Sequence, residues 1–160
     1  MPHLTPNLWF DDNALEAAEF YCSIFPNSKV TTVSHYTEAG PGVPGTILAV
    51  SWELDGQDFT GINGGPMFQF DEAVSFAINC KDQDEIDHYW NALTADGGEE
   101  SMCGWLKDKY GLSWQVVPED WEKMANDPDP ERVNRVMASM FQMKKFDIAA
   151  QQAAADGVTA

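Results

Sequence analysis

The chain has few histidine and cysteine side chains, which are common ligands of transition metals and common groups in catalysis. Its histidines and cysteines are His3, His35, His88, Cys22, Cys80 and Cys103. Metal and redox motifs place such residues at short spacings, as in Cys-x-x-Cys. No such spacing occurs in this sequence, so neither a zinc knuckle nor a redox dithiol is expected.

One histidine and one cysteine remain as candidates for chemistry. His35, near the end of a strand-like segment, is the candidate catalytic acid or base, and the alternative is a surface or hydrogen-bonded histidine. Cys103 precedes Gly104 without a histidine or an acid beside it, so an inert thiol is expected rather than a nucleophile. His3 precedes the first strand, and His88 lies off the apolar face of its helix, where we expect it to be solvated.

A second set of residues suits the binding of a small molecule. Amide and hydroxyl groups combined with flat apolar side chains are typical of small-molecule sites. The alternatives are tryptophans that fill the core and amides that bind water. The candidate ligand-binding residues are Asn7, Trp9, Trp52, Asn63, Ser75, Asn79, Trp105 and Gln115.

The elements that position these residues form an internal repeat. Asn13 and Asp82 each begin a capping box that ends in a glutamate three residues later, and they lie 69 residues apart. The aromatic pairs Phe20-Tyr21 and Tyr89-Trp90 have the same separation. This matched spacing predicts two duplicated units.

Each unit begins with a strand in which apolar residues alternate. Leu8 and Phe10 in the first strand, and the run 76–80 in the second, place their apolar side chains toward the following helix. Further strands are predicted at 29–36, 46–54, 57–62, 99–102, 104–107 and 112–117. Asp55-Gly56 predicts a two-residue hairpin turn, because both positions favour positive φ. Each unit is therefore predicted to be β-α-β-β-β.

The residues after the second unit are predicted to form a helical tail. A short helix is expected at 120–125, a turn at 127–130 with Pro130 at the first helical position, and one long helix from Glu131 to about Ala155. A methionine-rich apolar stripe along that helix indicates core packing or a subunit contact.

The predicted fold class is α+β. Two tandem βαβββ modules, at about 1–66 and 70–118, are expected to form a cupped mixed sheet. The tail follows at about 119–160, and all three parts are predicted to form one domain.

Several segments resemble a known family. The segments are Phe10–Tyr21, Cys103–Pro118, Asp127–Met137 and Met143–Ile148. They resemble the PhnB-like family, also called 3-demethylubiquinone-9 3-methyltransferase-like, of the vicinal oxygen chelate superfamily. That superfamily includes glyoxalase I, extradiol dioxygenases and bleomycin-resistance proteins, and the resemblance implies a homodimer.

The resemblance also implies where a metal would bind. Metal-binding members use four histidine or glutamate ligands on the central strands, and the matching positions here are Thr5, about Gly61, Ser75 and Gln115. These residues suit a transition metal poorly, so no metal and no cofactor is expected. Methyl transfer is not expected either, because the glycines at 61–65 precede no helix start that could hold S-adenosylmethionine.

Composition limits the partners. Nine Lys and Arg residues stand against 26 Asp and Glu, a formal charge of −17 that repels nucleic acids and anionic membranes. Three widely spaced cysteines and an N-terminus without a signal pattern favour the cytoplasm.

The leading hypothesis is a protein that binds a small organic molecule in a metal-free pocket. The alternatives are a metal-free lyase, isomerase or transferase, a metal-dependent enzyme of the glyoxalase or dioxygenase type, and a true methyltransferase.

Overall fold

The computed structural model of the chain describes residues 3–158. The chain divides between Phe70 and Asp71 into two compact units. Both units contain a four-stranded mixed sheet with a helix on one side, which confirms the α+β class and the two βαβββ modules. The grouping of both modules in one domain stays a prediction. No helix within residues 3–158 is long and apolar enough to span a bilayer.

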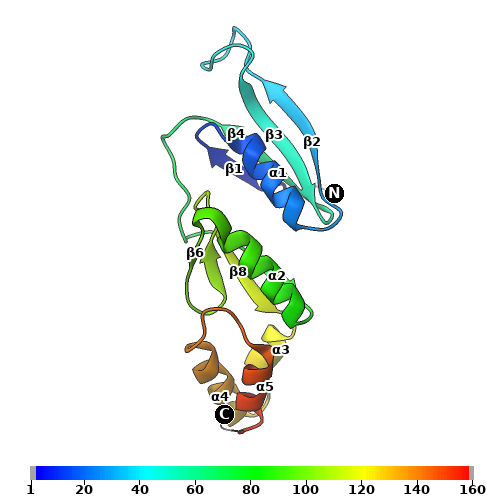
Figure 1. Cartoon of the computed structure of the whole chain (residues 1–160), viewed down its shortest axis with the longest axis vertical. Helices are drawn as coiled ribbons and strands as arrows, with labels where there is room; N and C mark the ends of the chain where they lie inside the picture. Colours follow the sequence, from blue (N-terminus) through cyan, green and yellow to red (C-terminus); the bar gives the residue numbers. More distant parts are fainter. Residues whose placement is uncertain (1–2, 159–160) are drawn as a thin grey trace. The chain divides into compact units, whose positions relative to one another are not determined.

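The first unit contains one helix and four strands (Figure 1). Its strands are in the order β1-β4-β3-β2, with β1 parallel to β4 and the other pairs antiparallel. The predicted hairpin turn is confirmed, because Asp55 and Gly56 have φ of 45° and 89°. The elements are β1 Asn7–Phe10, α1 Ala14–Ile24, β2 Lys29–His35, β3 Ile47–Leu54 and β4 Gln57–Asn63.

Helix α1 lies on the sheet through a row of small side chains. Ala14, Ala17 and Ala18 are fully buried, so the helix backbone approaches the strands closely. Tyr21 then meets Trp52 at 6.2 Å between ring centroids, and Trp52 stacks on Phe59 at 5.7 Å. Each such aromatic pair contributes about 0.5–1.5 kcal/mol beyond the apolar area it buries. This aromatic stack is the core of the first unit.

The start of helix α1 corrects the sequence-based prediction. Asn13 occupies the N-cap position but makes no side-chain cap hydrogen bond. The cap comes from Asn63 at the end of β4, whose Oδ1 accepts from the backbone N–H of Ala14 at 2.9 Å. Nδ2 of Asn63 donates to the Ile47 carbonyl, and the Asn63 carbonyl accepts from the Tyr36 hydroxyl. Asn63 therefore joins helix α1 to strands β3 and β4.

The second unit repeats this arrangement and adds the tail. Its strands are in the order β5-β8-β7-β6, with β5 parallel to β8. Asp82 caps α2 as predicted, since its Oδ1 accepts from the Glu85 N–H at 3.0 Å. The elements are β5 Ser75–Cys80, α2 Gln83–Thr94, a 3-10 turn Ala95–Gly97, β6 Glu99–Glu100, β7 Trp105–Lys107, β8 Ser113–Pro118, α3 Trp121–Ala125, α4 Pro130–Met140 and α5 Ile148–Ala155.

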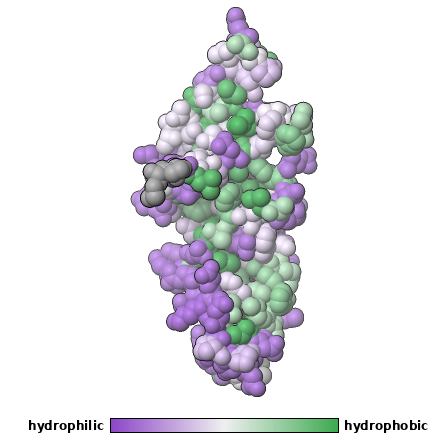
Figure 2. All heavy atoms as spheres, turned by 180° about the vertical axis from the view of Figure 1, so that it is seen from behind, coloured by the Kyte–Doolittle hydropathy of each residue, from purple (hydrophilic) through white to green (hydrophobic). Residues whose placement is uncertain are grey.

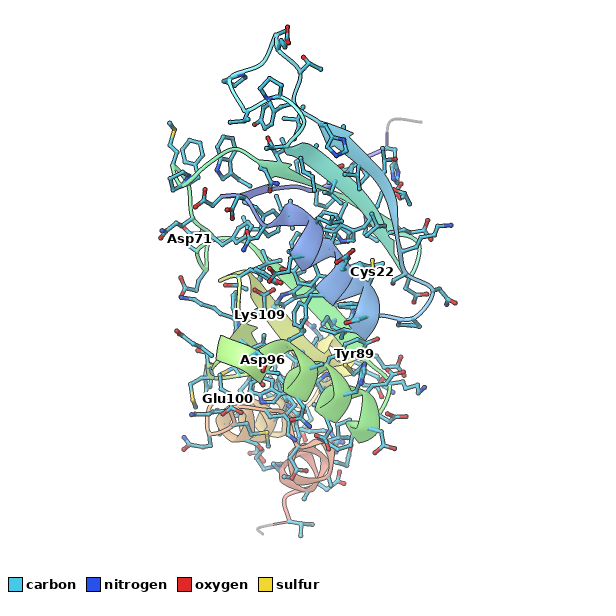
Figure 3. The ribbon with its side chains drawn as sticks, turned by 45° about the horizontal axis from the view of Figure 1, so that its top comes forward. Cys22, Asp71, Tyr89, Asp96, Glu100 and Lys109 are labelled. Carbon is cyan, nitrogen blue, oxygen red and sulfur yellow. The ribbon has the colours of Figure 1, made fainter. Side chains whose placement is uncertain are left out.

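Helix α2 is bound to its sheet by apolar packing and one buried indole. Ile86, Trp90 and Leu93 are buried. The Trp90 Nε1–H donates to Oε1 of Glu100 at 2.9 Å, and Figure 3 labels Glu100 at β6. The aromatic position predicted from the repeat thus packs inward in both modules, as Tyr21 in one and Trp90 in the other.

Asp108 is a buried carboxylate in the turn between β7 and β8. Its side chain is 2% exposed, and Oδ1 accepts from the backbone N–H groups of Tyr110 and Leu112. Oδ2 accepts from the Trp114 indole at 2.8 Å. A buried carboxylate is stable when several donors satisfy it, so Asp108 fixes the turn between β7 and β8.

The predicted long tail helix is wrong, because it breaks after Met140. Helix α4 ends at Met140, and α5 begins at Ile148 with Asp147 as its N-cap, accepting from the Ala150 N–H at 2.9 Å. In the break, the carbonyls of Met143 and Lys144 accept from the N–H groups of Cys103 and Gly104. These bonds to the sheet replace the helical bonds. The short helix α3 and Pro130 at the start of α4 are confirmed.

The capping role of Asn63 gives a first prediction. Replacing Asn63 with Ala leaves the Ala14 N–H and the Ile47 carbonyl without their partners, so we expect the free energy of unfolding to fall by about 1–3 kcal/mol. Urea unfolding measures this change. The matched variant Asn13→Ala removes no cap hydrogen bond and is expected to change stability by under about 0.5 kcal/mol. A larger loss for Asn13→Ala than for Asn63→Ala would contradict this assignment.

The ion pair between Asp87 of α2 and Lys145 of the tail gives a second prediction. Hydrogen bonds from Lys145 and then Gln83 hold the pKa of Asp87 below its ordinary value, so this carboxylate stabilises the fold above the unfolded pKa of about 4. That contribution is lost as the pH falls from about 4 through the lower folded pKa. We expect Asp87→Asn to lose less stability than the unmodified protein between pH 6 and 3, by urea unfolding. Asp84→Asn, on the exposed side of the same helix, is the control, and an equal acid sensitivity of the unmodified protein and Asp87→Asn would count against this role.

Candidate functional site

The second sheet has an open face on the side away from helix α2. Along β8, Trp114 and Val116 are buried toward the helix, so Ser113, Gln115 and Val117 point to the opposite face. Residues paired across strands share a face, and Ser75, Trp105 and Lys107 therefore join them. In Figure 2, hydrophobic side chains gather on one part of the second unit beside a hydrophilic strip.

A cavity of about 540 Å³ lies over this open face. The volume is within the range of sites for small organic molecules. Its floor comes from β7 and β8, one side comes from the loop before β7, and another comes from the tail. The lining residues are Glu72, Ser101, Met102, Cys103, Trp105, Leu106, Lys107, Ser113, Gln115, Val117, Trp121, Met140, Phe141 and Phe146.

The floor of the cavity carries one oriented amide. Nε2 of Gln115 donates to Oγ of Ser75 at 2.9 Å, and the two residues lie on adjacent strands. In the part of the chain that the structure describes, Oε1 of Gln115 has no protein donor. It is available to accept a hydrogen bond from a ligand hydroxyl or N–H group. The remaining floor, formed by Trp105 and Val117, is apolar.

Two residues of opposite charge at the edge of the cavity form an ion pair. Lys107 and Glu72 are joined by their side chains, and both line the cavity. Their hydrogen bond holds the pKa of Glu72 below its ordinary value and raises the pKa of Lys107. Both groups are therefore charged at neutral pH and cancel each other. The pair therefore adds no net charge to the cavity.

Cys103 lies at the cavity in an uncommon backbone conformation. Its φ is 58° and that of Gly104 is 79°, which turns the chain sharply into β7. The thiol is partly exposed and lies 3.7 Å from the carbonyl oxygen of Met140. This contact orients the sulfur but supplies no base, since a carbonyl cannot take up the thiol proton at neutral pH.

The structure brings only part of the predicted site together. Trp105 and Gln115 line the cavity, and Ser75 holds Gln115. Asn79 is exposed on the same sheet face but does not line the cavity. Asn7 and Trp9 belong to the first unit, where the Trp9 indole donates to the Gly65 carbonyl at 2.8 Å.

Two candidate residues lie on the wrong side of the first sheet. Trp52 is 1% exposed within the aromatic stack under α1, and its Nε1 has no partner among residues 3–158. Asn63 is buried and caps α1. Both side chains face the helix, so the expectation that they line a pocket is wrong. His35 is exposed on the edge strand β2 and does not line the cavity.

Sequence reasoning missed several cavity residues, and four of them come from the tail. Trp121, Met140, Phe141 and Phe146 all line the cavity. Met140 and Phe141 belong to the apolar stripe that predicted core packing or a subunit contact. The stripe indicated that the tail packs against another surface. The sequence did not indicate which surface, because the break in the helix was not predicted.

The residues present do not fit a divalent metal. Gly61 faces the helix, because an added Cβ would lie 3.0 Å from Trp52 and 3.1 Å from Phe10; its assignment as a ligand position was therefore wrong. Thr5, Ser75 and Gln115 offer only hydroxyl and amide oxygens, which are weak ligands for nickel, zinc or iron. Within residues 3–158, no three His, Cys, Asp or Glu side chains form a group that could hold a metal ion.

Two βαβββ modules, with a cavity on an open sheet face, define the class of glyoxalase/bleomycin-resistance-like proteins of the vicinal oxygen chelate superfamily. Residues 2–117 match the family described as 3-demethylubiquinone-9 3-methyltransferase. The chain belongs to this family. The match ends before the tail, so the resemblance of segments 127–137 and 143–148 lies outside it.

Solved structures agree with this assignment. A PhnB protein from Bacillus cereus is 35% identical, covers 73% of this chain and 99% of its own, and has a TM-score of 0.66. Protein PA1353 from Pseudomonas aeruginosa is 18% identical, covers 74% and 98%, and has a TM-score of 0.62, which shows the shared fold. None of the curated proteins compared with the chain matches it.

The glycines at 61–65 have a structural role. The N–H groups of Gly64 and Gly65 donate to the carbonyls of Phe10 and Asp11. An added Cβ at Gly64 would lie 2.2 Å from the Trp9 ring, so glycine is required for this close approach. No helix follows these glycines before β5, and the segment lacks the helix N-terminus that a nucleotide-like cofactor would use.

Proposed function

We propose that this protein binds a small, flat, uncharged organic molecule in the cavity of its second unit, without a metal. The observation that carries the proposal is the composition of the cavity. Trp105 provides a flat apolar surface on the sheet, and the Gln115 amide provides one oriented acceptor. Apolar walls supply affinity, and a single satisfied polar contact fixes orientation.

The metal-free enzyme has less support than the binding protein. His35, its candidate acid or base, is exposed on the first unit and is not among the residues that line the cavity. Cys103 lines the cavity, but the carbonyl oxygen beside its thiol is no base. Neither residue therefore has the positioned partner that acid–base or nucleophilic catalysis needs.

A direct test uses 2-naphthol, a flat neutral compound with one hydroxyl donor. We expect it to bind with micromolar affinity by isothermal titration calorimetry. Gln115→Ala should weaken binding about tenfold because the hydroxyl loses its acceptor. Asn79→Ala, on the same sheet face but outside the cavity, is the control. Equal affinities for all three proteins would refute the assignment of Gln115, and absence of binding to the unmodified protein would refute the proposal.

The cysteines provide an independent readout of where the ligand lies. Cys103 lines the cavity, Cys22 lies on α1 in the first unit (Figure 3), and both thiols are partly exposed. Burial raises the pKa of Cys80 to about 12, so this thiol should react least. Bound 2-naphthol should slow iodoacetamide labelling of Cys103, with labelling of Cys22 unchanged. Slowing at Cys22 alone would place the ligand elsewhere.

We also propose that the protein is a cytoplasmic homodimer. In the first unit, Met67 and Phe68 are 77% and 57% exposed, and Val74 in the second is 64% exposed. Exposed apolar side chains of this size are common at subunit contacts. All three cysteines are free, as a reducing compartment would keep them.

The dimer can be tested by light scattering after size exclusion. We expect twice the 17.8 kDa chain mass for the unmodified protein, and a lower mass for Phe68→Asp. A monomeric mass for the unmodified protein would overturn the dimer.

A further inference from the structure

The tail lies outside the family match yet forms part of the cavity. The match covers residues 2–117, and the Bacillus cereus protein aligns along 99% of its length with 73% of this chain. We call four lining residues the tail wall: Trp121, Met140, Phe141 and Phe146. The family match therefore includes the floor of the cavity but not this wall.

The tail wall is joined to the sheet by the backbone. The N–H of Cys103 donates to the Met143 carbonyl at 2.8 Å, and the N–H of Gly104 donates to the Lys144 carbonyl at 2.7 Å. Phe146, which is 1% exposed, lies against Gly104, where an added Cβ would be 2.6 Å from its ring. Gly104 is thus required for the ring to reach this position, and Phe146 is fixed next to the cavity floor.

Side chains of α2 and β6 hold the same loop. Nε2 of Gln83 donates to the Phe146 carbonyl at 3.0 Å, and its Oε1 accepts from the Ile148 N–H at 3.0 Å. Lys145 pairs with Asp87 at 2.6 Å, and Lys144 lies 3.9 Å from Glu100. Contacts on both sides of Phe146 in the chain, at Lys145 and at Ile148, therefore hold it in place.

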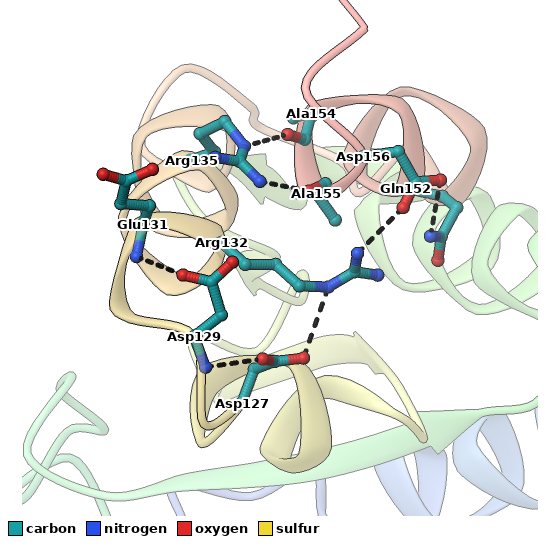
Figure 4. A network of polar contacts seen from close by, with 9 residues as sticks. All are labelled: Asp127, Asp129, Glu131, Arg132, Arg135, Gln152, Ala154, Ala155 and Asp156. Carbon is teal, nitrogen blue, oxygen red and sulfur yellow. Dashed lines mark hydrogen bonds and ion pairs between the residues drawn. The ribbon is translucent and has the colours of Figure 1, made fainter.

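A second set of contacts holds the helices of the tail together (Figure 4). Arg135 donates to the carbonyls of Ala154 and Ala155 at the end of α5, where positive charge is favourable. Arg132 pairs with Asp127 before α4 and with Asp156 after α5. These contacts keep α4, and with it Met140, in a fixed position relative to α5.

We infer that the tail wall makes the cavity selective for planar aromatic ligands over saturated ligands of similar size. This inference rests on the proposed function. Trp121 lies on α3 at the cavity, 5.9 Å from the Phe146 ring between centroids, and Trp105 provides an aromatic surface on the sheet. A preformed aromatic wall rewards a flat ring that can stack, and it offers a saturated ring only ordinary apolar contact.

The test compares 2-naphthol with decahydro-2-naphthol, which has the same ring skeleton and hydroxyl but is not flat. The ratio of their affinities in the full-length protein measures the selectivity. We expect Trp121→Leu to lower this ratio about three- to tenfold, since leucine keeps an apolar contact but removes the ring. Trp121→Phe should retain most of the ratio. Val158→Ala, an exposed tail position outside the cavity, is the control.

The outcomes separate this inference from the proposed function. If the unmodified protein binds neither compound, the proposed function fails. If it binds both but Trp121→Leu leaves the ratio unchanged, or weakens both ligands equally, the cavity stands and the selectivity of the tail wall is overturned. Circular dichroism and urea unfolding of each variant check that it is folded, and Trp121→Met, which also removes the ring and should also lower the ratio, provides a second measure if Trp121→Leu is unstable.

Discussion

Two backbone hydrogen bonds, from Cys103 and Gly104 to the carbonyls of Met143 and Lys144, hold the tail against the second sheet. Together with the contacts of Gln83 and Lys145, they keep the tail over the open face of that sheet, which is therefore one side of a cavity. They require the left-handed backbone at Cys103 and Gly104 and the end of helix α4 at Met140. The strain of a non-glycine residue at positive φ, on the order of 1 kcal/mol, is offset by the contacts that this turn permits.

The two modules share a topology but use different interactions for the same purpose. In the second, Asp82 caps α2 from the residue before the helix. In the first, Asn63 caps α1 from a strand 49 residues further along the chain. A cap of the second kind ties the helix to the sheet, so formation of α1 and closure of the β3–β4 hairpin depend on each other.

A fold alone does not establish a reaction, so the chemistry of the open sheet face follows only from the residues that it carries. Here the face carries an amide, a hydroxyl and tryptophan, with one neutral ion pair at the edge. Under the proposed function, this chemistry recognises a ligand by shape and by one hydrogen bond. Among residues 3–158, the cavity lining carries no histidine, and its one carboxylate, Glu72, is paired with Lys107.

By itself, the sequence determined the α+β class, the repeat and the strand alternation. These follow from local rules, because helix caps, period-two patterns and turn residues act within a few positions of the chain. It also indicated Trp105, Gln115 and Ser75 as residues of the open face, since alternation along a strand decides which face a side chain takes.

Only the tertiary structure decided the partners of these residues. Asn63 caps a helix that precedes it by about fifty positions, Asp108 is buried by its own hairpin, and Phe146 joins the cavity through bonds to a distant turn. None of these contacts has a signature in the adjacent sequence, because each depends on which segments the fold brings together. Strand register also depends on the tertiary structure, since a shift of one residue moves a position such as Gly61 to the opposite face.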